Sequence, residues 1–324
     1  MFYHLKIAIR NLKRDGMYSI INIGILTVGL ATASIGNIRA QNTWVGDGCS
    51  SITAYQISTA AQLAELSDSV TGGVSEYVGK FFLLAADIDL SEYNADEWMP
   101  IGRNKDGCRF NGTFDGNEKT VSNLHFNNSL NDQVGLFGCI GEAGTVKNLG
   151  VTDIVVAGGN NVGGLAGYNN GVITNCYATG TVYGSGNNIG SLVGHNLGAI
   201  TGSCAAGRVS SGGDNIGGLT GCNYGAITNC CATGTVHGSN YIGGLVGNNI
   251  GGRIEICYAS GAVSGIGSVG GLVGYNSGTV SGSFDKSGTG QRYGVGISYS
   301  GTTLVVDNPN AKRHCPDKYN DIIK

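Results

Sequence analysis

The sequence predicts an all-β fold, a parallel β-helix of roughly seven coils with an N-terminal capping helix and an N-terminal signal or anchor segment. Three observations favour this fold. A Gly-Leu-x-Gly tetrapeptide, called the phrase below, recurs six times, and residues at other positions of the aligned repeats recur with it. The glycines are also too closely spaced for long helices. The phrase starts at Gly135, Gly164, Ser191, Gly218, Gly244 and Gly271, with serine replacing glycine at 191. Its spacings of 29, 27, 27, 26 and 27 residues match one β-helix turn with three short apolar runs.

Residues 1–40 predict export. Four basic residues precede an uncharged stretch, and Ile38-Arg39-Ala40 offers a cleavage site before Gln41. This charge bias places the N-terminus in the cytoplasm and the following chain outside. Two interpretations stay open, a cleaved signal peptide and a retained membrane anchor, since the stretch is long enough to span a bilayer. The basic residues are Lys6, Arg10, Lys13 and Arg14.

Residues 41–109 are expected to hold an N-terminal cap and lead-in strands. Ser58 or Thr59 can cap a helix running to about Val70, with Leu63 and Leu66 on its apolar face. This helix would cover the first coil, because an exposed end strand invites pairing with another chain. The solenoid is expected over 110–301 and a tail over 302–324. The tail has no comparable apolar cap, which predicts either a truncated chain or a partner at the open C-terminal end.

Two alternating columns are expected to point into the core, because alternate residues of a strand share one face. Their large members are Leu124 with Phe126 and Leu149 with Val151, and the later coils carry smaller residues, so the core is expected to narrow. The later pairs are Cys176 and Ala178, Ser203 and Ala205, Cys230 and Ala232, and Cys257 and Ala259. Asp285, two residues after Ser283, would place a carboxylate inward, which predicts that the regular solenoid ends there.

An asparagine follows each of the last five Gly-Leu-x-Gly phrases. Stacking the coils would place these residues in one vertical ladder at a corner, each amide bonding its neighbours as in cross-β assemblies. The glycines are interpreted as turn positions with positive φ or as points of close backbone approach. The ladder residues are Asn169, Asn196, Asn223, Asn249 and Asn276.

All ten cysteines follow the export segment, in a compartment where disulfides persist. Cys176, Cys230 and Cys257 fall in an inward column and are interpreted as small core residues. Cys204 and Cys231 lie one column later, stacked and facing outward, and are the candidate disulfide. No Cys-x-x-Cys pair occurs, so no metal site is expected.

Catalytic signatures are missing from the sequence. None of the five histidines belongs to a His-Glu-x-x-His motif, and Gly-x-Ser-x-Gly does not occur. The net charge of -3 gives no electrostatic case for nucleic acid. A Gly-x-Gly-x-x-Gly match at 265–270 lies in a repeat turn without a following helix. We therefore expect a non-enzyme without catalytic residues, cofactor or metal.

A carbohydrate-active β-helix enzyme is the alternative, since such enzymes gather carboxylates on one face. Asp87 and Asp89 are a weak candidate for a catalytic carboxylate pair, and Asp106 and Asp115 are no stronger candidates. Within 158–282 the charged residues are Arg208, Asp214, Arg253 and Glu255, which fall on two separate coils.

Outward columns carry aromatic residues that define a candidate binding surface: Tyr168, Tyr177, Tyr258 and Tyr275. Phe284 continues one column, and His195 and Cys222 continue the other. Aromatic side chains on a flat β face stack on sugar rings and are common at protein interfaces. The alternative is that they shield backbone between glycines.

Two segments resemble known families. Residues 3–14 and 18–23 resemble the start of bacterial export-type ABC transporter permeases, but the likeness ends after about thirty residues and no further membrane spans follow. Residues 164–283, with lead-in segments at 82–90, 99–102 and 110–117, resemble the bacterial GLUG-motif family of surface and secreted proteins. That family includes adhesin-like proteins and the β-helical part of IgA-type metallopeptidases.

The GLUG resemblance implies an exported cell-surface solenoid, and together with the missing catalytic signatures it leads us to expect a non-catalytic binding, adhesion-like or structural module. The expected partner is a host or matrix protein or a surface glycan, and the membrane would be contacted only through the N-terminal segment. A repeat fragment of a larger surface protein, such as an IgA-type metallopeptidase, is a further alternative.

Overall fold

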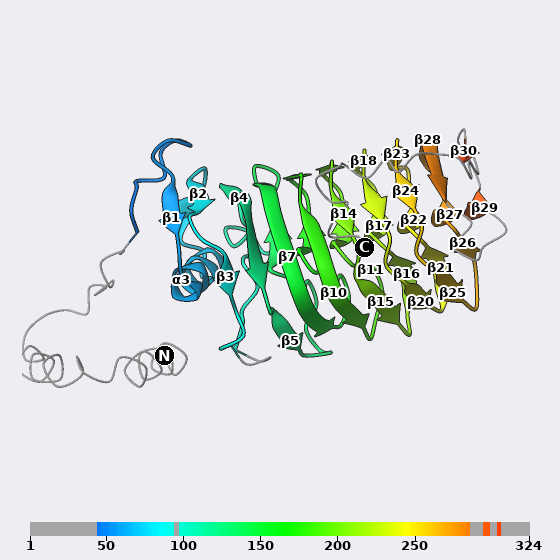
Figure 1. The fold of residues 1–324 in the computed structure, drawn as a ribbon, viewed down its shortest axis with the longest axis horizontal. Helices are drawn as coiled ribbons and strands as arrows, with labels where there is room; N and C mark the ends of the chain where they lie inside the picture. Colours follow the sequence, from blue (N-terminus) through cyan, green and yellow to red (C-terminus); the bar gives the residue numbers. More distant parts are fainter. Residues whose placement is uncertain (1–43, 94–96, 286–293, 299–302, 306–324) are drawn as a thin grey trace, which may run out of the picture. The chain divides into compact units, whose positions relative to one another are not determined.

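The computed structural model describes residues 44–93, 97–285, 294–298 and 303–305. These residues form a parallel β-solenoid of about eight turns, with the strands stacked side by side along one axis (Figure 1). The predicted export segment at 1–40 lies outside the described residues. No helix in the described part of the chain is both long and apolar enough to span a bilayer.

Three parallel sheets make up the sides of the solenoid. The four-stranded sheet contains β11 (Ile189–Gly190), β16 (Asp214–Gly217), β21 (Asn240–Gly243) and β26 (Val269–Gly270). The seven-stranded sheet contains β6 (Phe137–Ile140), β8 (Ala166–Asn169), β12 (Val193–Asn196), β17 (Thr220–Asn223), β22 (Val246–Asn249), β27 (Val273–Asn276) and β29 (Val295–Ser298). The nineteen-stranded sheet contains β1 (Tyr55–Ile57), β2 (Phe81–Leu84), β3 (Ile88–Asp89), β4 (Thr113–Ser122), β5 (His125–Asn127), β7 (Thr145–Gly158), β9 (Val172–Thr174), β10 (Tyr177–Gly184), β13 (Ala199–Thr201), β14 (Cys204–Ala205), β15 (Arg208–Ser211), β18 (Ala226–Thr228), β19 (Cys231–Ala232), β20 (Val236–Gly238), β23 (Arg253–Glu255), β24 (Tyr258–Ala259), β25 (Val263–Gly265), β28 (Thr279–Asp285) and β30 (Thr303–Val305).

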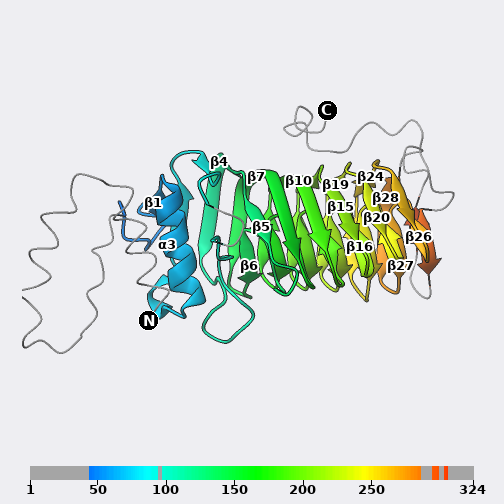
Figure 2. The same ribbon diagram turned by 90° about the horizontal axis from the view of Figure 1, so that it is seen from below.

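The capping helix α3 (Ala60–Thr71) lies at the N-terminal end of the stack (Figure 2). Thr59 is its N-cap: the Thr59 side chain accepts from the Gln62 backbone N–H, and the Gln62 side chain accepts from the Thr59 backbone N–H. Leu63 and Leu66 are fully buried in the core. A short 3-10 turn, η1 (Ser75–Tyr77), follows. The predicted helix is confirmed, with Thr59 rather than Ser58 as its cap.

The lead-in strands belong to the same sheet as the repeats. β1 pairs with β2, and β2 pairs with β4, so the first turns of the solenoid lie upstream of Phe110. Residues from Trp44 onward join one continuous hydrophobic core.

The predicted alignment of Leu124 and Phe126 with Leu149 and Val151 is wrong. The register places Val121 opposite Val151, and Phe126 opposite Val156. The cause is a bulge in β4 between Asp115 and Lys119, where Asn117 and Glu118 both have positive φ. Leu124 and Phe126 do point into the core, but in other columns.

From β7 onward the inward columns follow the expected order. Val151, Ala178, Ala205 and Ala232 lie opposite one another in consecutive coils. All four are buried, and the step from valine to alanine leaves less side-chain volume in the later coils. Ser283 is buried as predicted, whereas the side chain of Asp285 lies outside the described part of the structure.

The repeated glycines are required by close backbone approach. A Cβ atom at Gly194, which ends one phrase, would lie 2.5 Å from the Asn161 carbonyl carbon. A Cβ atom at Gly164, which begins another, would lie 2.7 Å from the Ser191 carbonyl oxygen. Neither glycine has a positive φ. Ser191 is tolerated because Gly207 faces its hydroxyl.

Left-handed turn positions form columns of their own, occupied mostly by asparagine. One column contains Asn148, Asn175, Gly202, Asn229, Ile256 and Gly282. Asparagine and glycine adopt positive φ at low cost. Ile256, at φ 52° and 49% exposed, is the residue in this column least suited to that conformation.

Candidate binding surface and side-chain ladders

The asparagine ladder runs through five coils and is fully buried. The Asn169 amide nitrogen donates to the Asn196 oxygen at 2.7 Å, and Asn196 donates to Asn223 at 2.8 Å. The same bond recurs from Asn223 to Asn249 and from Asn249 to Asn276. Each amide nitrogen also reaches a carbonyl oxygen within its own coil. The ladder therefore ties neighbouring coils together at one corner.

Further polar ladders follow the turns. Asn215 donates to Asn188, and Asn188 donates to Asn161, at 2.7 and 2.8 Å. Sequence reasoning missed this column, although its spacing of 27 residues repeats as regularly as that of the buried ladder.

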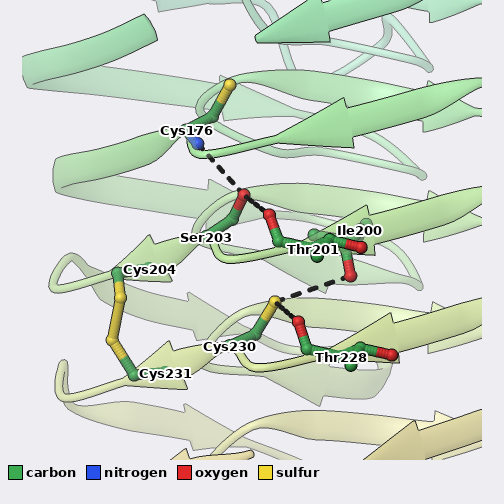
Figure 3. The surroundings of a disulfide bond; sticks show 8 residues. All are labelled: Cys176, Ile200, Thr201, Ser203, Cys204, Thr228, Cys230 and Cys231. Atoms are coloured by element: carbon green, nitrogen blue, oxygen red, sulfur yellow. Dashed lines mark hydrogen bonds between the residues drawn. A yellow bond between two sulfur atoms is a disulfide. The ribbon is translucent and has the colours of Figure 1, made fainter. Parts of the chain in front are cut away.

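Cys204 and Cys231 form a disulfide between consecutive coils, with their Cα atoms 4.6 Å apart (Figure 3). The two residues are direct register partners in β14 and β19. Their side chains lie outside the hydrophobic core cluster but are buried, at 3% and 0% exposure. The two side chains leave the core as predicted, but they are shielded from solvent; their register partners on either side in the same column are Tyr177 and Tyr258.

The inward column beside the disulfide combines cysteine and serine. The Ser203 hydroxyl accepts from the Cys176 backbone N–H at 3.1 Å and donates to the Thr201 carbonyl (Figure 3). The Cys230 thiol donates to the carbonyls of Thr228 and Ile200. Cys176, Cys230 and Cys257 are fully buried, so they are core residues that satisfy backbone groups.

Two of the candidate tyrosines are less available than the sequence suggested. Tyr177 is half-buried and lies across Gly150 of the preceding coil, where a Cβ atom would overlap its ring. Tyr258 is only 6% exposed, because it lies between Cys231 and strand β28. The predicted role of Tyr258 in an exposed surface is wrong on geometric grounds. The side chain of Phe284 lies outside the described residues.

Tyr168 belongs to a row of stacked rings on the outside of the seven-stranded sheet. Its ring centroid lies 5.0 Å from that of His195, with planes 14° apart, and His195 lies 5.4 Å from Tyr224 at 17°. Tyr275 contacts Tyr241 at 5.2 Å. Tyr224 and Tyr241 were missed because they lie outside the column of Tyr168, His195 and Tyr275. Tyr224 is 47% exposed and is the most accessible ring of this row.

The stacking determines what the row can bind. The centroid distances are close to the ~4.8 Å spacing of neighbouring strands, so adjacent rings cover each other's faces. Ring edges and hydroxyl groups are left to meet solvent, and the expectation of sugars lying flat on the aromatic faces is not met at His195. Burial raises the pKa of Tyr168 and lowers the pKa of His195, which favours the neutral form of both.

The lead-in carboxylates are structural hydrogen-bond acceptors. Asp87 accepts from the backbone and hydroxyl of Thr120. Hydrogen bonds from Asn123, then from Ser91, lower the pKa of Asp89. Burial acts to raise the pKa of Asp115, but hydrogen bonds from Asn117, Asn148 and Lys147 outweigh it and lower the pKa.

The remaining charged candidates do not gather at one place. Asp106 is exposed beside Arg109, and Arg253 pairs with Glu255 in the same strand. Asp214 accepts from Asn240 in the next coil at 3.0 Å, while Arg208 lies exposed on β15. Among the described residues, no group of three or more His, Cys, Asp or Glu side chains is placed to hold a metal ion.

These features define a parallel β-solenoid built from stacked Gly-Leu-x-Gly coils. Comparison with known proteins adds that the model of the GLUG motif matches residues 158–183 and 238–264. The resemblance of the N-terminal residues to export permeases finds no support in these comparisons.

Two relatives share part of the sequence. Halomucin of Haloquadratum walsbyi is 36% identical over 126 residues, which are 37% of this chain and 1% of halomucin. A Gly-rich membrane protein described from Evansella cellulosilytica is 41% identical over 125 residues, 37% of this chain and 14% of that protein. The chain thus corresponds to a small part of each relative's length.

A solved structure shares the fold. A protein from Bacteroides ovatus, provisionally described as an immunoglobulin A1 protease, superimposes with a TM-score of 0.61 at 22% identity. The match covers 78% of this chain and 79% of that one. At this identity the likeness concerns the fold alone.

Proposed function

We propose that this chain is a non-catalytic binding module of an exported surface protein, with adhesion to a glycan or a matrix protein as its activity. The observation that carries the proposal is the row of stacked rings on the seven-stranded sheet, of which Tyr224 is 47% exposed. Tyrosine presents apolar area together with a polar edge, which suits recognition surfaces.

The electrostatics support a non-enzyme. A glycosidase pair needs one carboxyl group with a raised pKa to act as acid. Asp89 and Asp115 have lowered pKa values and are held by hydrogen bonds. Burial raises the pKa of Glu65, but this side chain accepts a hydrogen bond from Trp44 beside the capping helix, where it supports structure.

Three observations support export: the basic residues before an apolar stretch at the N-terminus, the disulfide between Cys204 and Cys231, and the relatives' descriptions as a halomucin and a membrane protein. The small share of each relative that the chain covers favours a second candidate. Under that interpretation the solenoid is a structural repeat segment of a longer surface protein.

The test is binding of the purified full-length chain to arrays of glycans and matrix proteins, with glycan hydrolysis followed in the same wells. Saturable binding without product, weakened by Tyr224→Ala but not by Tyr183→Ala, supports the module. Tyr183 is a matched control because it is 43% exposed on a different sheet. Product release would refute the non-enzyme proposal. If neither binding nor hydrolysis is detected, the second candidate, a structural repeat segment of a longer surface protein, is favoured.

A further inference from the structure

A small pocket opens where the end of α3 meets the first coils. Its volume is about 120 Å³, which suits a ligand smaller than the drug-sized molecules held by typical sites. Phe126 of β5, with Val134, Met99 and Pro100, forms its apolar lining, and Arg103, Asp132 and Gln133 contribute the functional polar groups. This pocket is separate from the stacked rings of the seven-stranded sheet.

Hydrogen bonds hold the polar lining in place. One carboxylate oxygen of Asp132 accepts from the Asn160 backbone N–H at 2.7 Å and from its side chain at 3.1 Å. The Gln133 carbonyl oxygen accepts from the Asn104 backbone N–H at 3.0 Å. Thr71 bridges the opposite wall, donating to the Pro100 carbonyl and accepting from the Gly102 N–H. A ligand therefore meets groups whose positions are already restricted.

The same bonds leave the outer ends of these side chains unused. Within the described part of the chain, the second oxygen of Asp132 and the amide nitrogen of Gln133 have no protein partner. Arg103 is exposed and has no ion-pair partner among the described residues. The pocket thus offers an anionic acceptor, a cationic donor and an amide donor beside the buried ring of Phe126.

We propose that this pocket binds a single sugar residue at the end of a glycan chain. A sugar hydroxyl both donates and accepts, so neighbouring hydroxyls can bond Asp132 and Arg103 together, while the C–H face of the ring packs on Phe126 and Pro100. Arg103 and Asp132 give the lining no net formal charge, so it suits a neutral ligand that both donates and accepts hydrogen bonds. This inference rests on the proposed glycan-binding function and gives it a second site, apart from the stacked rings.

The test uses the full-length chain and four methyl pyranosides, those of glucose, galactose, mannose and N-acetylglucosamine, titrated by ligand-observed NMR. At least one is expected to bind with a dissociation constant on the order of 1 mM, as for a ligand of this size. Arg103→Gln and Asp132→Asn should each weaken binding about tenfold, because each removes a hydrogen bond to a charged group. Asp132→Asn keeps the oxygen that accepts from Asn160. Arg208→Gln, an exposed arginine on β15, is the matched control and should leave binding unchanged.

Equal binding by wild type, Arg103→Gln and Asp132→Asn would overturn the pocket assignment and leave the proposed surface function standing. Failure of all four sugars, with array binding retained, would overturn it in the same way. Failure of the sugars together with silent arrays would overturn both proposals.

Discussion

Asn196 is an internal member of the buried ladder, and replacing it with alanine tests how much the ladder contributes to stability. The change removes one bond from Asn169, one to Asn223 and one to the Gly198 carbonyl. It leaves the Asn223 oxygen without its donor, while the Asn169 amide nitrogen keeps only its bond to the Gly171 carbonyl. At about 1–3 kcal/mol for the orphaned oxygen and about 1 kcal/mol for each of the two further bonds lost, the expected loss is about 3–5 kcal/mol.

Asn169 supplies the comparison because the ladder begins there. Its partner in the preceding coil is Ile140, so Asn169→Ala breaks only one ladder bond, but it leaves the Asn196 oxygen without its donor and the buried Gly171 N–H without its acceptor. The cavity is the same in both variants, and two orphaned groups at about 1–3 kcal/mol each give a comparable expected loss of about 2–6 kcal/mol.

The assay is urea unfolding combined with amide hydrogen exchange. Each coil contacts only its neighbours, so Asn196→Ala should speed exchange in β8, β12 and β17 and leave β2 and β4 unchanged. Losses below about 1 kcal/mol for both variants would refute the claim that the buried ladder contributes to stability.

Asn196→Asp extends the reasoning to pH. When protonated, the introduced carboxyl group can donate to the Asn223 oxygen, whereas the ionised group cannot donate and carries a buried charge. The folded pKa of this carboxyl group should therefore rise above its unfolded value of about 3.9. Relative to wild type, the variant is therefore most stable at pH values below the unfolded pKa, and it loses stability as the pH rises through the raised folded pKa. A pH-independent difference from wild type would contradict this.

Three further outcomes are expected. Ile256→Asn should raise the free energy of unfolding, measured by urea titration, by about 1 kcal/mol, because asparagine adopts the left-handed conformation at lower cost than isoleucine. Ile266 is 88% exposed and has no positive φ, so the control variant Ile266→Asn should give no gain. Thr220→Val should stabilise the protein by about 1 kcal/mol, because the Thr220 hydroxyl is buried without a hydrogen-bond partner and the register neighbours of Thr220 are Val193 and Val246. If the same unfolding assay shows a destabilised variant, the hydroxyl must have a hydrogen-bond partner. Iodoacetamide on a Cys315→Ser background should label Cys49, which is exposed with the Lys80 ammonium 3.2 Å from its sulfur. It should spare Cys139 and Cys222, because burial raises their pKa to about 11 and about 12; comparable labelling of these two by peptide mapping would contradict the burial.

The sequence by itself determined the features that depend on the repeat. A constant spacing of about 27 residues in a parallel solenoid brings equal positions of successive coils together, so Asn196 meets Asn223 and Cys204 meets Cys231 wherever the coils stack regularly. The capping helix could be predicted for a different reason. Thr59 and Gln62 form a local signal that needs no tertiary partner.

Only the tertiary structure decided the features in which coils differ. The bulge at Asp115–Lys119 shifts the alignment of Leu124 and Phe126, and no periodicity marks it because it occurs before the regular repeats begin. Exposure was likewise hidden: Tyr177 and Tyr258 share one column, yet one is half-buried and the other buried. The periodicity of a repeat predicts on which face of its strand a side chain lies. The residues of adjacent coils determine how deeply that side chain is buried. Contacts between coils also stack Tyr224 on His195 and form the pocket beside α3.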